Sequence, residues 1–122
     1  MLNMKKLLTK IINRLGSDMT YITASNGITG GLRLWKDKSS GTIRGYGYYR
    51  RATDINMDTT IFSIPSGFRP SGDTEIPMFM YTSTGLCAAY YGKITAGGVL
   101  TQRLGATIRE GFTTFEYQIF ED

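Results

Sequence analysis

The sequence contains no histidine, only one cysteine and only three prolines among its 122 residues. Without histidine and with a single cysteine, the chain excludes internal disulfides, zinc sites built from His and Cys, Ser-His-Asp triads and Cys-His dyads. It also has no run of 18 apolar residues, which a membrane-spanning helix needs. We therefore expect no cofactor, no metal site, no membrane insertion and no enzymatic activity.

Glycine and aromatic residues are abundant instead. The chain has 15 glycines, eight tyrosines and six phenylalanines, and its hydrophobic and charged fractions of 41% and 20% are those of an ordinary folded protein. A chain of this length is expected to build one hydrophobic core. Aromatic segments broken by glycine are typical of short strands joined by tight turns. The composition therefore predicts a compact β domain.

Roughly eight strands are predicted at spacings of about 8 to 12 residues. Their ranges are 19–24, 28–37, 41–51, 59–64, 75–82, 86–96, 99–104 and 107–120. Alternation supports several of them, since Leu32 and Leu34 share one face while Arg33 and Trp35 share the other. The pattern predicts a mainly β fold, a jelly-roll-like β-sandwich head over residues 17–122.

The first 16 residues have a helical period. Apolar residues stand at Met1, Met4, Leu8, Ile11 and Leu15, in the steps of three and four that form a coiled-coil seam, and Gly16 offers a left-handed cap where the pattern stops. A helix of this length is marginal alone in water, so it requires packing. We expect a helical neck over residues 1–16 that associates through Met4, Leu8, Ile11 and Leu15, with docking on its own domain as the alternative.

Two other interpretations of this segment are weaker. Lys10 and Arg14 interrupt the apolar run that a signal peptide would need. A membrane-surface helix would be expected to carry aromatic anchors, and none is present. The formal net charge of +4 comes largely from four cations of this segment, Lys5, Lys6, Lys10 and Arg14, which favours a solvated helix over a nucleic-acid interface.

Two motifs follow in the second half of the chain. The segment Ser63–Pro70 reads SIPSGFRP; its prolines end a strand and fix the loop exit, and Gly67 permits positive φ. Downstream, Tyr91–Val99 reads YGKITAGGV. Together they resemble the carboxy-terminal head domains of bacteriophage tail-fibre and receptor-binding proteins, in which an LPxGfRP segment precedes a glycine-containing hairpin; Ile64 stands where leucine is usual.

The resemblance implies a homotrimer with a β-sandwich head on a helical or coiled neck, located at the virion tail beside other tail proteins. It also implies that the head binds a saccharide of the bacterial cell surface. The alternative function is a structural trimerisation or assembly cap that binds no ligand.

Saccharide recognition needs flat aromatic faces together with side chains that hydrogen-bond hydroxyl groups. The segment from Arg44 to Arg51 is the richest in both, and alternation places Tyr46, Tyr48 and Arg50 on one strand face. Gly45 and Gly47, on the opposite face, would allow a neighbouring chain or ligand to approach. The candidate ligand-binding residues are Trp35, Tyr46, Tyr48, Arg50 and Tyr91, with core or anchor packing as their structural alternative.

Three further features are interpreted as structural. The segment Asp54–Asp58 has the oxygen spacing that opens a calcium loop, but Thr59 and Pro65 stand where the turn glycine and the bidentate glutamate are needed. We expect a polar connector here, with a looser cation site as the alternative. The carboxylates Asp73, Glu75 and Glu110 have no spacing that predicts a glycosidase pair. Cys87 lies between Leu86 and Ala88 and is expected to be a buried small hydrophobe.

Overall fold

The computed structural model describes residues 3–13, 16–82, 84–85 and 87–119. It shows one helix, α1 (Met4–Asn13), followed by the strands β1 (Ser17–Thr23), β2 (Thr29–Asp37), β3 (Thr42–Ile55), β4 (Phe62–Ser63), β5 (Thr74–Thr82), β6 (Cys87–Ile94), β7 (Val99–Gln102) and β8 (Ile108–Gln118). The prediction of a mainly β domain with a short N-terminal helix is confirmed.

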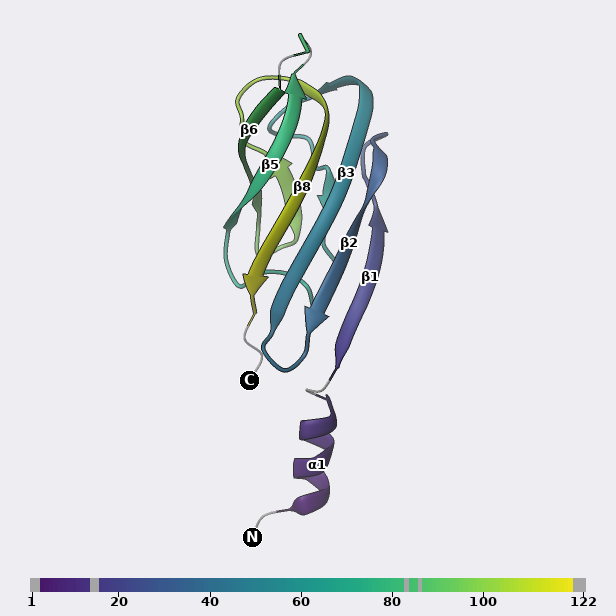
Figure 1. Cartoon of the computed structure of the whole chain (residues 1–122), viewed down its shortest axis with the longest axis vertical. Helices are drawn as coiled ribbons and strands as arrows, with labels where there is room; N and C mark the ends of the chain where they lie inside the picture. The colour runs from purple at the N-terminus through teal and green to yellow at the C-terminus, as the bar shows by residue number, and fades with distance from the viewer. Residues whose placement is uncertain (1–2, 14–15, 83, 86, 120–122) are drawn as a thin grey trace.

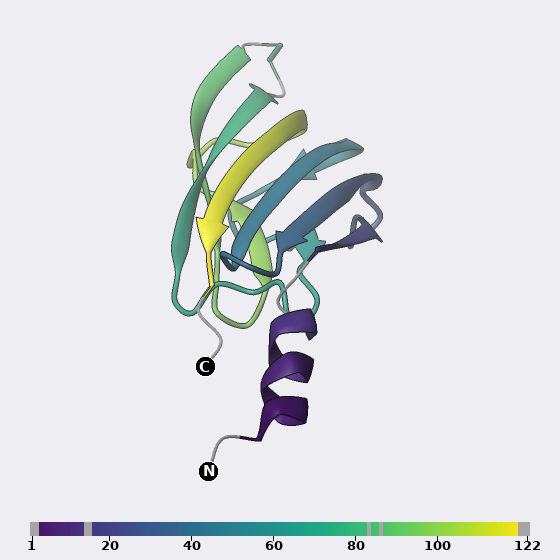
Figure 2. The same cartoon turned by 60° about the horizontal axis from the view of Figure 1, so that its bottom comes forward.

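The strands form one antiparallel sheet in the order β1-β2-β3-β8-β5-β6-β7-β4. The sheet folds back on itself, so β7 and β4 lie behind the strands at the front (Figures 1 and 2). Its two edges also meet, since the amide of Ser25, just after β1, donates a 2.9 Å hydrogen bond to the carbonyl of Ile61, just before β4. The result is a nearly closed sheet of sandwich or barrel type.

The core lies inside this curved sheet. Leu32 and Leu34 of β2 are fully buried while Arg33 and Trp35 are exposed, so the alternation read from the sequence is confirmed. The second half of β8 repeats the pattern, since Phe115 and Tyr117 face the core while Thr114, Glu116 and Gln118 face outward. We call the exposed side of β1, β2, β3, β8, β5 and β6 the outer face.

Gly45 and Gly47 of β3 leave space for side chains of the chain's own core. A side chain at Gly45 would collide with the ring of Phe115, and one at Gly47 would lie 2.9 Å from Leu32. Phe115 itself is only 6% exposed. The expectation that a neighbouring chain or ligand approaches at Gly45 and Gly47 is therefore wrong, because the chain's own core fills that space.

Two boundaries differ clearly from the sequence prediction. Strand β4 has two residues instead of six, because the side chain of Asn56 accepts hydrogen bonds from the Asp58 amide at 2.9 Å and the Thr59 hydroxyl at 3.1 Å and so forms a turn. Strand β3 continues to Ile55, and its register with β8 shifts between Arg50 and Ile55.

The two motifs that carry the family resemblance contact each other. The amide of Ile64 donates to the carbonyl of Gly98 at 2.7 Å, and Arg69 Nε donates to the carbonyl of Ile64 at 2.7 Å. Gly67 has the positive φ expected for the loop, +93°. The hydroxyl of Tyr117 donates to the Phe68 carbonyl. These contacts give both motifs a structural role on the side of the domain that β4 and β7 build.

Helix α1 extends away from the lower end of the sheet (Figures 1 and 2). Met4 and Leu8 are 58% and 53% exposed, so they do not pack on the chain's own domain. The side chain of Ile11 and all of Leu15 lie outside the described residues. Gly16 has a positive φ of +85°, while α1 ends at Asn13 and the two residues before Gly16 lie outside the described part of the chain, so its role as the helix cap stays a prediction. No helix in the described part of the chain has the length and apolar character that crossing a membrane requires.

Candidate functional site

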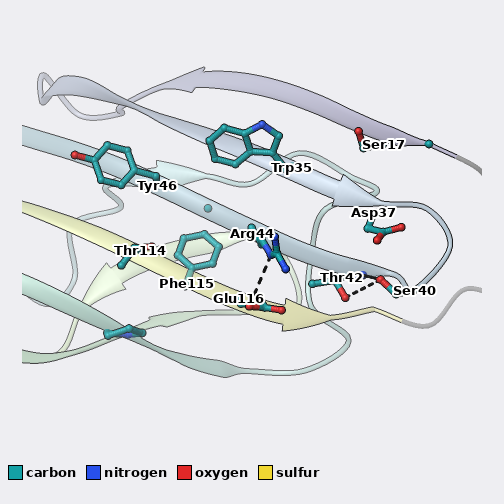
Figure 3. A pocket seen from close by; sticks show the side chains of 13 residues that line it. Ser17, Trp35, Asp37, Ser40, Thr42, Arg44, Tyr46, Thr114, Phe115 and Glu116 are labelled. Carbon is teal, nitrogen blue, oxygen red and sulfur yellow. Dashed lines mark hydrogen bonds and ion pairs between the residues drawn. The ribbon is translucent and has the colours of Figure 1, made fainter.

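The candidate site is an open hollow of about 1290 Å³ at the end of the outer face nearest α1. It lies across β2, β3 and β8 (Figure 3). Its lining combines aromatic, charged and hydroxyl side chains with backbone: Gly16, Ser17, Trp35, Asp37, Ser40, Thr42, Arg44, Gly45, Tyr46, Pro77, Thr114, Phe115 and Glu116.

Strand register brings the central residues together. Trp35 in β2 lies opposite Arg44 in β3, and Arg44 lies opposite Glu116 in β8. Tyr46 is two residues further along β3 and lies opposite Thr114. Because residues i and i+2 of a strand share a face, all of these side chains point to the outer face.

Two aromatic rings provide the apolar part of the hollow. Trp35 is 36% exposed and Tyr46 is 54% exposed, and both rings stand on the outer face in Figure 3. Rings that are partly supported by the sheet and partly open to solvent can stack on a flat apolar ligand surface. They are therefore available for binding.

The charged groups of the hollow are balanced. Arg44 Nε lies 3.8 Å from Glu116 Oε2, and both side chains are well exposed, at 70% and 60%. An exposed ion pair of this length contributes little stability. Arg44 and Glu116 are therefore free to exchange their mutual contact for contacts with a ligand at low cost.

Asp37 lies at the lower rim of the hollow. The hydroxyl and amide of Ser39 donate to its Oδ1 at 2.7 and 2.9 Å, and the hydroxyl bond in particular lowers the pKa of this carboxyl below its usual value. Asp37 therefore stays ionised at neutral pH and acts as a hydrogen-bond acceptor.

The structure brings together only part of the residue set expected from sequence. Trp35 and Tyr46 line the hollow. Tyr48 and Arg50 continue along the same face of β3, and the Tyr48 hydroxyl donates to Glu110 Oε1 at 2.7 Å, a bond that raises the pKa of Tyr48. Tyr91 is half-buried in β6, opposite Pro77. These three lie outside the hollow, and their role in ligand binding stays a prediction.

The sequence interpretation did not single out Asp37, Arg44, Thr114 or Glu116 as site residues. Arg44 begins the aromatic segment that was chosen, but its neighbours come from β2 and β8. Alternation predicted that Glu116 faces outward. It gives no information on which strand lies beside β8, so the pairing of Arg44 with Glu116 was not predictable.

The prediction for Cys87 is wrong. Its side chain is exposed, at the start of β6 and opposite Tyr81 of β5 on the outer face. The apolar neighbours of Cys87 in the sequence suggested burial, but this end of the β5–β6 hairpin lies beyond the core.

The Asp54–Asp58 segment joins the end of β3, at Asp54 and Ile55, to the turn that Asn56 forms with Asp58. Asp54 Oδ1 accepts a 3.0 Å hydrogen bond from Arg109 Nε, and Ile55 between the polar residues is fully buried. Among the described residues, no three His, Cys, Asp or Glu side chains gather in the way that a metal ion would need.

Comparison with protein-family models gives no match for this chain, and comparison with curated proteins gives none either. The resemblance to tail-fibre head domains therefore stays a prediction based on its two motifs.

Proposed function

We propose that this chain is a receptor-binding domain of bacteriophage type, which attaches to a host by binding a cell-surface saccharide without altering it. The observation that carries the proposal is the hollow on the outer face, where Trp35 and Tyr46 stand beside the charged pair Arg44 and Glu116. Aromatic faces next to hydrogen-bonding groups are the combination that a sugar ring requires.

The shape of the hollow favours an extended ligand. Enclosed sites for small molecules typically measure about 300 to 1,000 Å³. The hollow is larger, at about 1290 Å³, and it is open to solvent along the sheet. A polysaccharide chain lying across β2, β3 and β8 would fit such a surface better than a single small molecule would.

The charges of the hollow favour a neutral saccharide. Arg44 is offset by Glu116, and Asp37 adds a further negative charge. Carboxylates accept hydrogen bonds from sugar hydroxyls, and they would repel a phosphate or uronate group. We therefore include the neutrality of the ligand in the proposal.

The carboxyl groups also support binding without catalysis. A general acid for glycoside hydrolysis needs a raised pKa, and the pKa of Asp37 is lowered by its bonds from Ser39. Glu116 is well exposed beside Arg44, whereas the general acid of a glycosidase is typically enclosed by apolar side chains.

The same proposal includes assembly as a homotrimer in the virion tail, with α1 as the neck. Its support is the apolar stripe of α1, in which Met4 and Leu8 are exposed although they stand at seam positions. The sheet begins at Ser17, so helices joined in a neck would hold the heads side by side.

Trp35 gives a direct test because it is the only tryptophan of the chain and lines the hollow. We expect its fluorescence to change in a saturable way when the protein is titrated with neutral polysaccharides purified from bacterial cell walls. Anionic wall polymers serve as the comparison set. Unchanged fluorescence with every polymer, together with a blank glycan array, would refute the proposal; tight binding confined to the anionic polymers would refute its neutral-ligand part.

A matched pair of variants assigns the binding to the hollow. Tyr46→Ala removes an exposed ring, and we expect it to weaken binding by about 0.5 to 1.5 kcal/mol, or roughly two- to tenfold. Tyr90→Ala removes a ring of similar exposure, 47% against 54%, that does not line the hollow, and it should bind as the unaltered protein does. Equal affinities of both variants would place the ligand elsewhere. The absence of released sugar after long incubation would agree with binding alone.

A second function, an assembly cap with no ligand, is favoured by one different observation. Phe79 and Phe112 leave a stacked pair of rings open on the outer face. A protein that forms trimers in solution but binds no wall polysaccharide would support the cap over the receptor-binding domain.

A further inference from the structure

The outer face carries a second feature, beside the hollow, on β8, β5 and β6. We infer that a second copy of this chain packs on this apolar patch, which consists of Phe79, Tyr81, Ala89 and Phe112. The inference deepens the assembly part of the proposed function and rests on it, because it names the surface through which the heads meet.

The patch is built by strand register. Phe79 of β5 lies directly opposite Phe112 of β8, and their rings stack with centroids 4.9 Å apart and planes 17° apart. Ala89 of β6 continues the same row beside Phe79, and Tyr81 begins the next row. Three neighbouring strands thus present a continuous apolar surface.

The rings of the patch are exposed, and only the hydroxyl of Tyr81 among them is a polar group. Phe79, Phe112 and Tyr81 are 37%, 39% and 45% exposed. With the adjacent ring of Tyr48, they leave roughly 250 to 400 Å² of aromatic surface open, if each side chain presents about 150 to 250 Å². A continuous patch of about 300 to 600 Å² is the largest found on a typical monomer and commonly marks an interaction site.

The surroundings of the patch have the composition of a protein interface. Interfaces place aromatic residues at the centre, exclude charge there and carry polar groups at the rim. The four patch residues are uncharged, and the neighbouring row contains Arg50 opposite Glu110, one charge of each sign. A standard interface takes about 800 Å² from each partner, so the patch supplies its centre and the mixed outer face supplies the rest.

Helix α1 indicates that the occupant is a copy and not an unrelated protein. Its exposed apolar residues Met4 and Leu8 are four positions apart, and the sequence continues the seam to Ile11 and Leu15. A seam of this period is a self-association pattern. Because only residues 14–16 separate α1 from β1, association of the helices would bring the heads of the copies next to one another.

The charge on the outer face is compatible with meeting a copy. In the rows that alternation turns outward, β2, β3 and β8 carry Arg33, Arg44 and Arg50 against Asp37, Glu110 and Glu116, three of each sign. Beyond Arg50, where the register shifts, Asp54 and Arg109 form an ion pair, and Arg51 bonds to the Asn26 carbonyl. A face with nearly balanced charge can meet the surface of a neighbouring copy without strong net repulsion.

The patch adjoins the hollow on the same face. Pro77 and Thr114, which line the hollow, stand two residues from Phe79 and Phe112, about 7 Å along an extended strand. A copy centred on the patch would therefore border the hollow, which continues across β3 and β2 toward Trp35.

The test is the mass of the full chain in solution as a function of concentration, by sedimentation equilibrium or light scattering. The unaltered protein should form multiples of 13.6 kDa. The double variant Phe79→Ser with Phe112→Ser should need at least about tenfold higher concentration to assemble, since aromatic residues at an interface centre carry much of its affinity. A single-chain mass for the unaltered protein, or unchanged assembly of the double variant, overturns the inference.

Tyr90→Ser is the matched control. Tyr90 lies opposite Met78, which is buried, so it belongs to the other side of the sheet from Phe79. Its assembly should equal that of the unaltered protein, and a loss equal to that of the double variant would overturn the inference. A far-ultraviolet spectrum and the fluorescence of Trp35 confirm that each variant is folded.

A second measurement uses Cys87, the only cysteine, which is exposed at the edge of the patch opposite Tyr81. Nitroxide labels on Cys87 should couple between copies in the assembled protein. Labels that remain magnetically isolated in the assembly would place the interface elsewhere and overturn the inference.

These results are independent of ligand binding. Loss of assembly in the double variant, combined with no response of Trp35 to polysaccharides, would support the interface and refute the saccharide proposal. If the double variant assembles normally and the protein binds a saccharide, the saccharide proposal would be supported and the interface refuted.

Discussion

Tyr49 in β3 lies directly opposite Gly111 in β8, and its hydroxyl occupies the space that a side chain at residue 111 would need. Tyr49 is fully buried and packs edge-on against Phe62, with ring centroids 6.4 Å apart. A Cβ at residue 111 would also lie 2.5 Å from the carbonyl oxygen of Phe79. The glycine therefore makes room for both a core side chain and the neighbouring strand.

Gly111→Ala should lower the free energy of unfolding by about 1 to 3 kcal/mol, the usual cost of overpacking a well-filled core. Chemical denaturation measures this loss. Gly72→Ala is the matched control, because a Cβ there meets nothing within 4 Å. Combining Gly111→Ala with Tyr49→Phe should restore part of the loss, since the hydroxyl is one of the two obstacles. Equal costs for Gly111→Ala with and without Tyr49→Phe would contradict this packing.

Stability should fall as the pH rises above about 10, the ordinary pKa of tyrosine. Burial raises the pKa of Tyr49 and of Tyr117 in the folded state. Between the unfolded and folded pKa values, the folded chain holds protons that the unfolded chain releases, so stability is complete below pH 10 and is lost above it. Each such tyrosine contributes a fall of about 1.4 kcal/mol per pH unit in that window.

Melting temperatures between pH 8 and 11.5 test this, with Tyr49→Phe as the comparison. The variant removes one of the two groups and should lose stability less steeply above pH 10. It also removes a buried hydroxyl that makes no hydrogen bond to the described residues, so it should be at least as stable at pH 7. Parallel pH profiles of the two proteins would show that Tyr49 does not titrate abnormally.

The fold class was predictable from sequence because the alternation of buried and exposed residues and the glycine-containing turns are set by residues close together in the chain. Alternation in β2 and β8 placed Leu34 and Phe115 in the core and Trp35 on the surface, and glycine-rich turns marked most strand ends. The length of β4 was not predictable, because it depends on how the side chain of Asn56 organises a turn. Strand order was not predictable either, because β3 pairs with β8 from the far end of the chain.

The candidate site depends on that same long-range pairing. Trp35 and Tyr46 were chosen from the sequence because their residue types suit saccharides, and β2 and β3 are neighbours along the chain. Glu116 and Thr114 reach the hollow only because β8 inserts between β3 and β5. The exposed pair Phe79 and Phe112 was not predicted for two reasons. Each aromatic residue taken alone is typical of a core, and the two rings meet only because β5 pairs with β8.

The neck prediction can be tested on the full chain. Leu8→Asp with Ile11→Asp places two charges on the apolar seam of α1, where their burial between copies would be strongly unfavourable. The mass in solution should fall toward that of one chain. Thr9→Asp adds one negative charge at an exposed position outside the seam and should leave the mass unchanged. Full assembly of the seam variant would show that α1 makes no contribution to association.

Tyr48 tests how far a bound polysaccharide extends along β3. It is 41% exposed between the hollow and the apolar patch, and its hydroxyl donates to Glu110. Tyr48→Ala should weaken binding of a long polysaccharide by roughly three- to tenfold through loss of the ring, and should change the melting temperature little because no core contact is removed. Tyr48→Phe keeps the ring and should bind nearly as well as the unaltered protein. A large loss of stability in Tyr48→Ala would show that Tyr48 belongs to the core. Equal weakening by both substitutions would show that Tyr48 acts through its bond to Glu110 and not as a stacking surface.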